Sequence, residues 1–157
     1  MDITLAHSSD LPTVRACAEA AYEIYVERIG QKPMPMIQDF AEPISQEQLW
    51  LAKTGPLEAP HTGEQQFMRG FALFYPRADH IHLENVAVFP SAQGLKIGSS
   101  LIAFVERQAR NQGLKAIELY TNIHMTENHT YYPHLGYEEI GRGSENGFER
   151  IYYRKEL

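Results

Sequence analysis

A short glycine-containing segment, Gln93 to Ser99, is the part of this sequence whose residues indicate chemistry most directly. It follows alternating apolar and polar residues, typical of a strand, at 80–89 and precedes apolar residues at helical spacing. Small residues at such a turn let backbone N–H groups converge, and the first helical turn adds unpaired donors and the positive end of its dipole. The pattern is typical of an anion-binding loop that holds a diphosphate. The alternative is a plain strand–helix connection in which the glycines serve only for turning.

Two other phosphate-binding loops do not fit the spacing. A P-loop requires Gly-Lys-Ser/Thr after its first glycine and four further residues, but Gly98 is followed by Ser99 and Ser100 without a lysine. A dinucleotide-binding loop requires three glycines in G-x-G-x-x-G order and an acidic residue at the end of the next strand, which this sequence also lacks.

The segment resembles the acetyl-CoA-binding segment of the GCN5-related N-acetyltransferase (GNAT) superfamily. There, a strand of the form Val-x-Val-x-Pro leads to a Gln/Arg-x-x-Gly-x-Gly/Ala loop, and here Val86-Ala87-Val88-Phe89-Pro90 leads to Gln93. Lys96 departs from the pattern, because it stands where the middle glycine is expected. Its side chain either crowds the pyrophosphate or points outward and adds a positive charge, and the backbone donors are kept in both cases.

The resemblance implies that acetyl-CoA is the cofactor, used as a co-substrate. Backbone groups of Val86, Ala87 and Val88 would pair with its pantetheine arm like an added strand. The pyrophosphate would lie on the loop and the first helical turn, whose residues are Gln93, Gly94, Leu95, Lys96, Ile97, Gly98 and Ser99.

Acetyl transfer from a thioester to an amine requires a neutral amine, a donor for the developing oxyanion and an acid for the leaving thiolate. In GNAT proteins the usual acid is the tyrosine of a Tyr-x-x-Leu-Gly-Phe/Tyr segment, which Tyr132 to Tyr137 matches. A phenol, with an ordinary pKa of about 10, can donate to a thiolate. The alternative is that Tyr132 only packs its ring. Asn128 lies four residues earlier on the same helical face and is either a CoA contact or a capping or surface residue.

Glu84 is the first candidate for the base that deprotonates the acceptor amine, and His82 is the second. Glu84 shares its face of the predicted strand with Val86 and Val88, and GNAT proteins often place a glutamate there, which acts directly or through water. His82 is one step earlier on that face, and an imidazole titrates near neutral pH. The alternative for both is a sheet residue hydrogen-bonded to a neighbouring strand.

By resemblance the acceptor lies between the first helices and the hairpin strands. The candidates there are Tyr22, Tyr25, Arg28 and Met36. Two tyrosines three residues apart are also typical of core or rim packing, and Arg28 either binds a carboxylate of the acceptor or forms an exposed salt bridge.

Length and composition indicate one domain, residues 1–157, that buries its own core. The chain is 43% hydrophobic, and its single cysteine, Cys17, excludes an intramolecular disulfide and a cysteine-based zinc cluster. The histidine spacings match no ligand pair apart from His80/His82, so no metal is expected. The net charge of −6 argues against nucleic-acid binding. The absence of a bilayer-spanning apolar run or a signal peptide predicts a cytoplasmic location without membrane association.

The predicted order of elements is strand, helices, three strands, helix, strand, helix and two strands, which indicates an α+β fold. A first helix is predicted to be capped by Ser9 or Asp10 and to end near Gly30, and Asn146-Gly147 is a strong β-hairpin signal. Strands are predicted at 2–7, 49–52, 67–75, 80–89, 115–121, 137–142 and 148–154, further helices at 36–42, 97–111 and 126–135, and a loop at 55–66.

The GNAT fold has this order, and the resemblance covers Ile3 to Lys155. It implies a central mixed, mostly antiparallel sheet of six to seven strands flanked by about four helices, and it allows a homodimer. Met125 to Asn128, Tyr132 to Tyr137 and Glu145 to Arg150 are similar to one bacterial GNAT subgroup. The implied function is direct transfer of an acetyl group from acetyl-CoA to a primary amine of a small molecule or peptide. The alternatives are a non-catalytic acyl-CoA-binding regulatory module and transfer to a hydroxyl group.

Overall fold

A computed structural model of the protein describes residues 1–55 and 66–157. Within these residues seven strands form one sheet in the order β1-β2-β3-β4-β5-β7-β6. β4 and β5 are parallel, whereas the pairs β1–β2, β2–β3, β5–β7 and β6–β7 are antiparallel. The predicted α+β fold with a mixed, mostly antiparallel sheet is therefore confirmed. The loop predicted at 55–66 lies, apart from its two end residues, outside the described residues.

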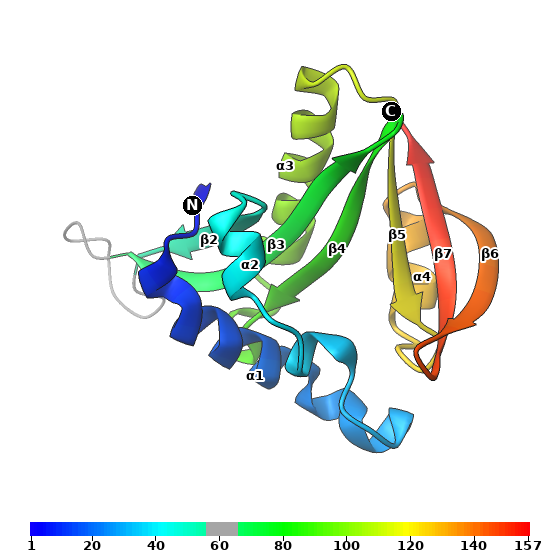
Figure 1. The fold of residues 1–157 in the computed structure, drawn as a ribbon, viewed down its shortest axis with the longest axis horizontal. Helices are drawn as coiled ribbons and strands as arrows, with labels where there is room; N and C mark the ends of the chain where they lie inside the picture. Colours follow the sequence, from blue (N-terminus) through cyan, green and yellow to red (C-terminus); the bar gives the residue numbers. More distant parts are fainter. Residues whose placement is uncertain (56–65) are drawn as a thin grey trace. The chain divides into compact units, whose positions relative to one another are not determined.

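The strands and helices are shown in Figure 1. The strands are β1 (Asp2–Leu5), β2 (Leu49–Thr54), β3 (Phe67–Arg77), β4 (His80–Val88), β5 (Ala116–Asn122), β6 (Glu138–Glu145) and β7 (Phe148–Glu156). The α-helices are α1 (Leu11–Ile29), α2 (Ala41–Ser45), α3 (Ile97–Asn111) and α4 (Asn128–His134), and the 3₁₀ helices are η1 (Ser8–Asp10), η2 (Met34–Met36) and η3 (Pro90–Ala92).

The chain forms two compact units. Unit 1 comprises Met1–Leu73 and Asn85–Ala103, and unit 2 comprises Phe74–Glu84 and Phe104–Leu157. The division passes through β3, β4 and α3, so each of these elements contributes residues to both units.

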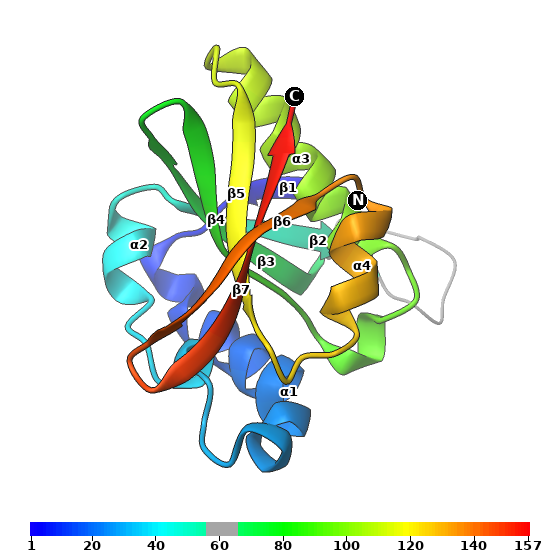
Figure 2. The ribbon, with the colours of Figure 1, turned by 90° about the vertical axis from the view of Figure 1, so that its right-hand side faces the viewer.

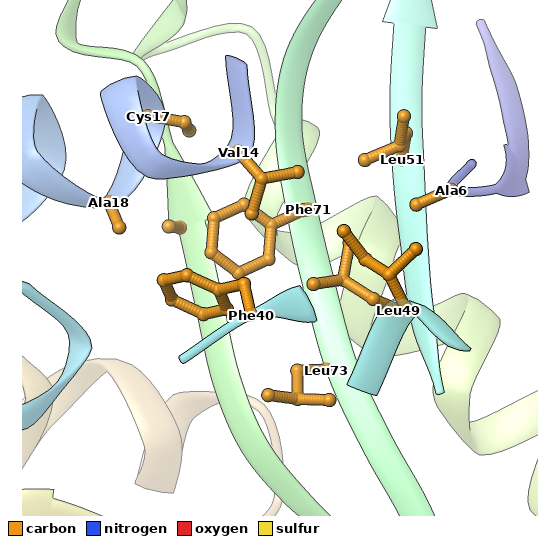
Figure 3. Close-up of a cluster of buried hydrophobic side chains, with 11 residues drawn as sticks. Ala6, Val14, Cys17, Ala18, Phe40, Leu49, Leu51, Phe71 and Leu73 are labelled. Atoms are coloured by element: carbon orange, nitrogen blue, oxygen red, sulfur yellow. The ribbon is translucent and has the colours of Figure 1, made fainter. Parts of the chain in front are cut away.

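Unit 1 contains a buried hydrophobic cluster shared by α1, β2 and β3 (Figure 3). Phe40, which precedes α2, packs edge-on against Phe71 of β3, with ring centroids 5.4 Å apart. Cys17 of α1 is fully buried in the cluster, and burial raises the pKa of its thiol to about 12. The other buried members are Ala6, Val14, Ala18, Ile44, Leu49, Leu51, Leu73 and Ala87.

Unit 2 contains β5 with its neighbours β4 and β7, and the β6–β7 hairpin. Asn146 and Gly147 at the hairpin turn both have positive φ values, 54° and 80°, as a two-residue turn between twisted strands requires. Figure 2 shows this hairpin as a long twisted ribbon. The Asn-Gly pair therefore forms the predicted turn.

The ends of α1 follow the sequence signals. Asp10 occupies the N-cap position and Pro12 lies in the first turn, where its missing N–H is not needed. Asp10 accepts a hydrogen bond from the His7 backbone N–H at 2.8 Å, and no side-chain bond from Asp10 caps α1. Gly30 ends the helix at a φ of 86°, where its N–H donates to the Val26 carbonyl at 2.8 Å.

Several predicted boundaries are wrong. The helix predicted at 36–42 is replaced by η2 and α2, since Pro43 is tolerated in the first turn of α2, where its N–H would have no helical partner. β3 continues through Pro76 to Arg77, because this exposed strand end can accommodate a residue without an N–H. β1 ends two residues early at Leu5, α4 is shorter than predicted at both ends, and β6 extends to Glu145.

Candidate active site

The predicted anion-binding loop connects β4 to α3 within unit 1. Gly94 and Lys96 have positive φ values of 83° and 61°, which turn the chain sharply ahead of the helix. The Lys96 carbonyl accepts the first helical hydrogen bond, from Ser100 N at 3.0 Å, and also one from the Ser99 hydroxyl at 3.1 Å. Backbone N–H groups before Ser100 therefore have no acceptor inside α3, as an anion site at a helix N-terminus requires.

The side chains of this loop differ in their exposure. Gln93, Leu95 and Lys96 are exposed, whereas Ile97 is buried. Ile97 therefore contributes only backbone groups to a ligand on the loop. Lys96 adopts a left-handed conformation, which favours glycine and is sterically unfavourable for a residue with a side chain.

Within unit 1, α1 and β3 both contact the part of β4 that is predicted to pair with pantetheine. The Tyr22 hydroxyl of α1 lies 2.6 Å from Asn85 Oδ1 and 3.1 Å from the Val86 carbonyl. A Cβ added to Gly70 of β3 would stand 2.5 Å from the Ala87 carbonyl oxygen, so β3 and β4 approach closely at this point. Asn85 is only 3% exposed, and its Nδ2 has no hydrogen-bond partner among the described residues.

Two further predicted acceptor residues lie next to Tyr22 on α1. The rings of Tyr22 and Tyr25 have centroids 6.2 Å apart, and the guanidinium carbon of Arg28 lies 5.3 Å from the Tyr25 centroid. Arg28 is exposed, and Met36 is half-buried in η2. The three α1 residues thus form one series of neighbouring side chains.

A row of aromatic rings crosses β3, β4, β5 and β7 in unit 2. Its successive centroids are 5.4, 5.7 and 6.3 Å apart, in the order Tyr75, His82, Tyr120 and Tyr152. Burial, followed by the charges of Arg77, His80 and Arg150, lowers the pKa of His82 to about 4. The imidazole is neutral at pH 7 and weakly basic, so its setting favours packing and makes Glu84 the stronger candidate for the base.

The carboxylate of Glu84 acts on two phenols of this row. The pKa of Tyr75 and that of Tyr120 are both raised, mainly by burial and further by the negative charge of Glu84. The charge of Glu84 therefore reaches both phenols.

Arg150 of β7 covers Tyr120, the third ring of the row. Its guanidinium carbon lies 4.1 Å from the centroid of Tyr120, and its side chain is 6% exposed. Nη1 donates to Glu145 Oε2 at 2.6 Å. The sequence did not assign Arg150 or Tyr120 to the site. Arg150 ends the Glu145–Arg150 motif, and Tyr120 alternates with apolar residues of β5, and these two signals could have identified them.

Tyr132 is packed on α4 in unit 2. Its ring is surrounded by three other phenol rings, at centroid distances of 5.3 Å to Tyr131, 5.8 Å to Tyr137 and 5.8 Å to Tyr153. These contacts fix the orientation of the Tyr132 ring relative to α4 and β7. This packing is expected if Tyr132 only packs its ring, and it also suits an acid that must be held in one position.

Asn128 begins α4 and connects it to β5. Its Nδ2 donates to the Thr121 hydroxyl at 2.8 Å and lies 3.9 Å from Met125 Sδ. Because the amide nitrogen has these partners, any contact of Asn128 with CoA would be made by its Oδ1 oxygen.

His80 is engaged by carboxylates on both ring nitrogens. Nδ1 lies 3.0 Å from Asp79 and Nε2 lies 2.7 Å from Glu118. Among the described residues, no group of three or more His, Cys, Asp or Glu is placed to hold a metal ion. In the same residues, no helix combines the length and apolar character needed to cross a membrane.

Comparison with known proteins gives consistent results. A sequence model described as Acetyltransferase (GNAT) family matches residues 16–137. Over 57 residues the chain is 39% identical to the aminoalkylphosphonate N-acetyltransferase of Salmonella typhimurium, which covers 36% of this chain and 37% of that relative. The chain thus matches little more than a third of the length of this curated relative.

Two solved structures resemble nearly the whole chain. The PaiA N-acetyltransferase of Thermoplasma acidophilum, solved in complex with coenzyme A, has a TM-score of 0.71 at 14% identity, with 99% of this chain and 98% of that chain covered. A GNAT acetyltransferase from Staphylococcus aureus Mu50 has a TM-score of 0.76 at 19% identity, with the same coverage, 99% and 98%. These likenesses show the fold. With the family match, they confirm the predicted resemblance to the GNAT superfamily.

Proposed function

Because the chain belongs to the acetyltransferase (GNAT) family, we propose that it transfers an acetyl group from acetyl-CoA to a primary amine of a small molecule, within one complex of both substrates. When bound, acetyl-CoA supplies the acetyl group as a thioester, and the net reaction forms an amide bond, breaks the thioester C–S bond and releases one proton. The observation that carries the proposal is the loop before α3, with its left-handed Gly94 and Lys96 and with N–H groups before Ser100 that have no acceptor inside α3.

The residues of this segment fit the proposed cofactor. α3 is 15 residues long, so its N-terminus carries a full helix dipole toward the exposed loop at Gln93 to Ser99. Backbone groups of Val86, Ala87 and Val88 would hold the pantetheine arm, and Tyr22 and Gly70 fix that part of β4. Asn128 would contribute its Oδ1.

Glu84 is the proposed base. A primary ammonium has a pKa of about 10 and must lose a proton before its nitrogen can attack. Glu84 would take that proton directly or through water. The lowered pKa of His82, about 4, makes the histidine a weak base and supports the choice of Glu84.

Tyr132 is the proposed acid, which would protonate the leaving sulfur. Its support is the match to the Tyr-x-x-Leu-Gly-Tyr segment and the three rings that hold it in place. A fixed donor loses little orientational freedom during the reaction.

The acceptor is proposed to be a small amine rather than a peptide. The Salmonella relative is named for aminoalkylphosphonates, which are small amines that carry an acidic group. Tyr22, Tyr25 and Arg28 are proposed acceptor contacts. The hydroxyl of Tyr22 already bonds to β4, so Tyr22 would contribute its ring.

Three sequence-based expectations stay predictions: a cytoplasmic location, a single domain over residues 1–157 and a possible homodimer. Light scattering after size exclusion measures the oligomeric state. Coincident unfolding of both units, followed by a probe in each, would support the single domain.

Calorimetric titration with acetyl-CoA, using NAD and ATP as controls, tests the cofactor first. Saturable binding of acetyl-CoA alone supports the loop assignment. Absence of binding would overturn it and leave the proposal without its cofactor.

Release of CoA thiol in the presence of amines then tests catalysis. Tyr132→Phe should lower the turnover number by tenfold or more while retaining acetyl-CoA binding, and Tyr131→Phe serves as the neighbouring control. An unchanged turnover number across pH would exclude Tyr132 as the required acid. Binding without turnover of any amine would favour a regulatory module.

A further inference from the structure

We propose that Arg150 binds an acidic group of the acceptor, so that the amines acetylated by this protein carry a carboxylate or phosphonate close to the reacting nitrogen. This inference rests on the proposed function and adds the chemical class of the acceptor. It uses residues of unit 2, and it gives a role to the Glu145–Arg150 motif, which the proposed mechanism does not otherwise use.

The guanidinium of Arg150 has more hydrogen-bonding capacity than the protein uses. It carries five N–H donors, and among the described residues only the bond from Nη1 to Glu145 Oε2, at 2.6 Å, satisfies one of them. The side chain is nevertheless 6% exposed, so water can reach little of it. A nearly buried guanidinium is costly unless its charge and its donors are matched, and the best match is a two-oxygen contact with an anion.

The present partner of Arg150 is easily replaced. Glu145 is 58% exposed and stands at the end of β6, beside the Asn146-Gly147 turn. Water can solvate this carboxylate when it leaves, so its departure costs little. We infer that Glu145 neutralises Arg150 in the free protein and that an anionic acceptor group takes its place.

Tyr120 connects Arg150 with the proposed base. The guanidinium lies over the Tyr120 ring, and the charges of Arg150 and Glu84 act on the Tyr120 phenol in opposite directions. Tyr120 lies on β5, which pairs with β4 on one side and β7 on the other. The proposed anion-binding group on β7 therefore lies over a ring whose ionisation is also affected by the proposed base on β4.

The test amines isolate the contribution of an acidic group. 3-Aminopropanoate and 2-aminoethylphosphonate each carry an acidic group two methylene groups from the nitrogen, and propylamine, which is of similar size, carries none.

Thiol release with 3-aminopropanoate, 2-aminoethylphosphonate and propylamine tests the inference. We expect kcat/KM to be at least tenfold higher for an acid-bearing amine than for propylamine, and the better of the two acids identifies the group. Arg150→Gln should abolish this preference by raising KM for the acid-bearing amines. Arg142→Gln is the control, because Arg142 is an exposed arginine paired with Glu139 on β6.

Glu145→Gln provides a second variant that leaves Arg150 in place. If Glu145 competes with the acceptor, its replacement should lower KM for the acid-bearing amine severalfold and leave propylamine unchanged. Equal kcat/KM for the three amines in the unmodified protein, or a preference that survives in Arg150→Gln, would overturn the proposal.

A binding measurement separates this inference from the proposed function. The Nε–H resonance of Arg150 is assigned by its loss in Arg150→Lys and followed in the CoA-bound protein as each amine is added. A shift with the acid-bearing amines but not with propylamine supports anion binding even if no thiol is released, in which case acetyl transfer alone has failed. No shift with either acid overturns the inference, whatever the activity.

Discussion

The hydroxyl of Tyr22 lies 2.6 Å from the side-chain oxygen of Asn85 and thereby joins α1 to β4 within unit 1. Asn85 is almost completely buried, and the same hydroxyl lies 3.1 Å from the Val86 carbonyl. Asn85 stands in the chain between the proposed base, Glu84, and the backbone proposed to bind pantetheine. The Tyr22 hydroxyl therefore helps to fix β4, the strand that carries the proposed base and the backbone proposed to bind pantetheine.

Tyr22→Phe should lower the free energy of unfolding by about 1–2 kcal/mol, because it leaves the buried Asn85 oxygen without its donor. Urea unfolding measures this change. Thr13→Ala, at an exposed position of α1, is the control and should shift the value by no more than about 0.5 kcal/mol. Equal values for the two variants would mean that Asn85 finds another partner.

Gly70→Ala should weaken acetyl-CoA binding and lower the free energy of unfolding by about 1–3 kcal/mol. The added Cβ would stand 2.5 Å from the Ala87 carbonyl oxygen, so the β4 backbone must shift. Gly141→Ala is the matched control, since a Cβ there meets nothing within 4 Å. Lower stability with unchanged acetyl-CoA affinity would separate this carbonyl region from the cofactor site.

Lys96→Gly should raise stability by at most about 1 kcal/mol, because relief of the left-handed strain is partly offset by the greater freedom of glycine in the unfolded chain. Acetyl-CoA affinity, measured by calorimetry, should change by no more than about threefold, since the backbone donors are kept. Lys96→Ala retains the strain and removes the charge. A loss of binding in both variants would identify the lysine as a phosphate ligand.

His82 should make stability fall as pH decreases from about 6.5 to about 4. Its pKa is lowered in the folded protein, so the unfolded chain binds the proton more strongly across this window. The loss is up to about 3 kcal/mol at the acidic end. His82→Phe should flatten this part of the profile of urea midpoint against pH, whereas His124→Gln, at an exposed site, should preserve it.

Glu84→Gln should lower kcat at pH 7 by about 10²-fold or more while leaving acetyl-CoA affinity intact. Activity should recover as pH rises, because the amine then loses its proton to solvent. Steady-state rates between pH 7 and 10 test this. An unchanged rate at pH 7 would move the base elsewhere, and His82→Phe would then be measured in the same way.

Local sequence patterns predicted most of the secondary structure. The alternation along β4, the helical spacing after Ile97 and the Asn146-Gly147 turn each depend on residues close together in the chain. The error around Pro43 arose because a proline stops a helix in its interior but not in its first turn.

The side-chain contacts of the site could not be predicted in the same way. Tyr22 and Asn85 are 63 residues apart, and the pairing of β5 with β7 brings Arg150 over Tyr120. The packing of α1 on β4 determines the first contact and the register of the folded sheet determines the second, and neither can be seen in local sequence. The family motif predicted a role for Tyr132, but the three rings packed against it come from residues whose spacing carries no signal of contact.

The burial of Cys17 has a practical consequence. The chain has no other cysteine, and a thiol with a pKa of about 12 forms almost no thiolate near neutral pH. Colorimetric thiol reagents should therefore report released CoA with little background from the protein itself. For the same reason, one cysteine introduced on the β6–β7 hairpin would be the only reactive site for a fluorophore, and a label placed there could follow the departure of Glu145 from Arg150 when an acceptor binds.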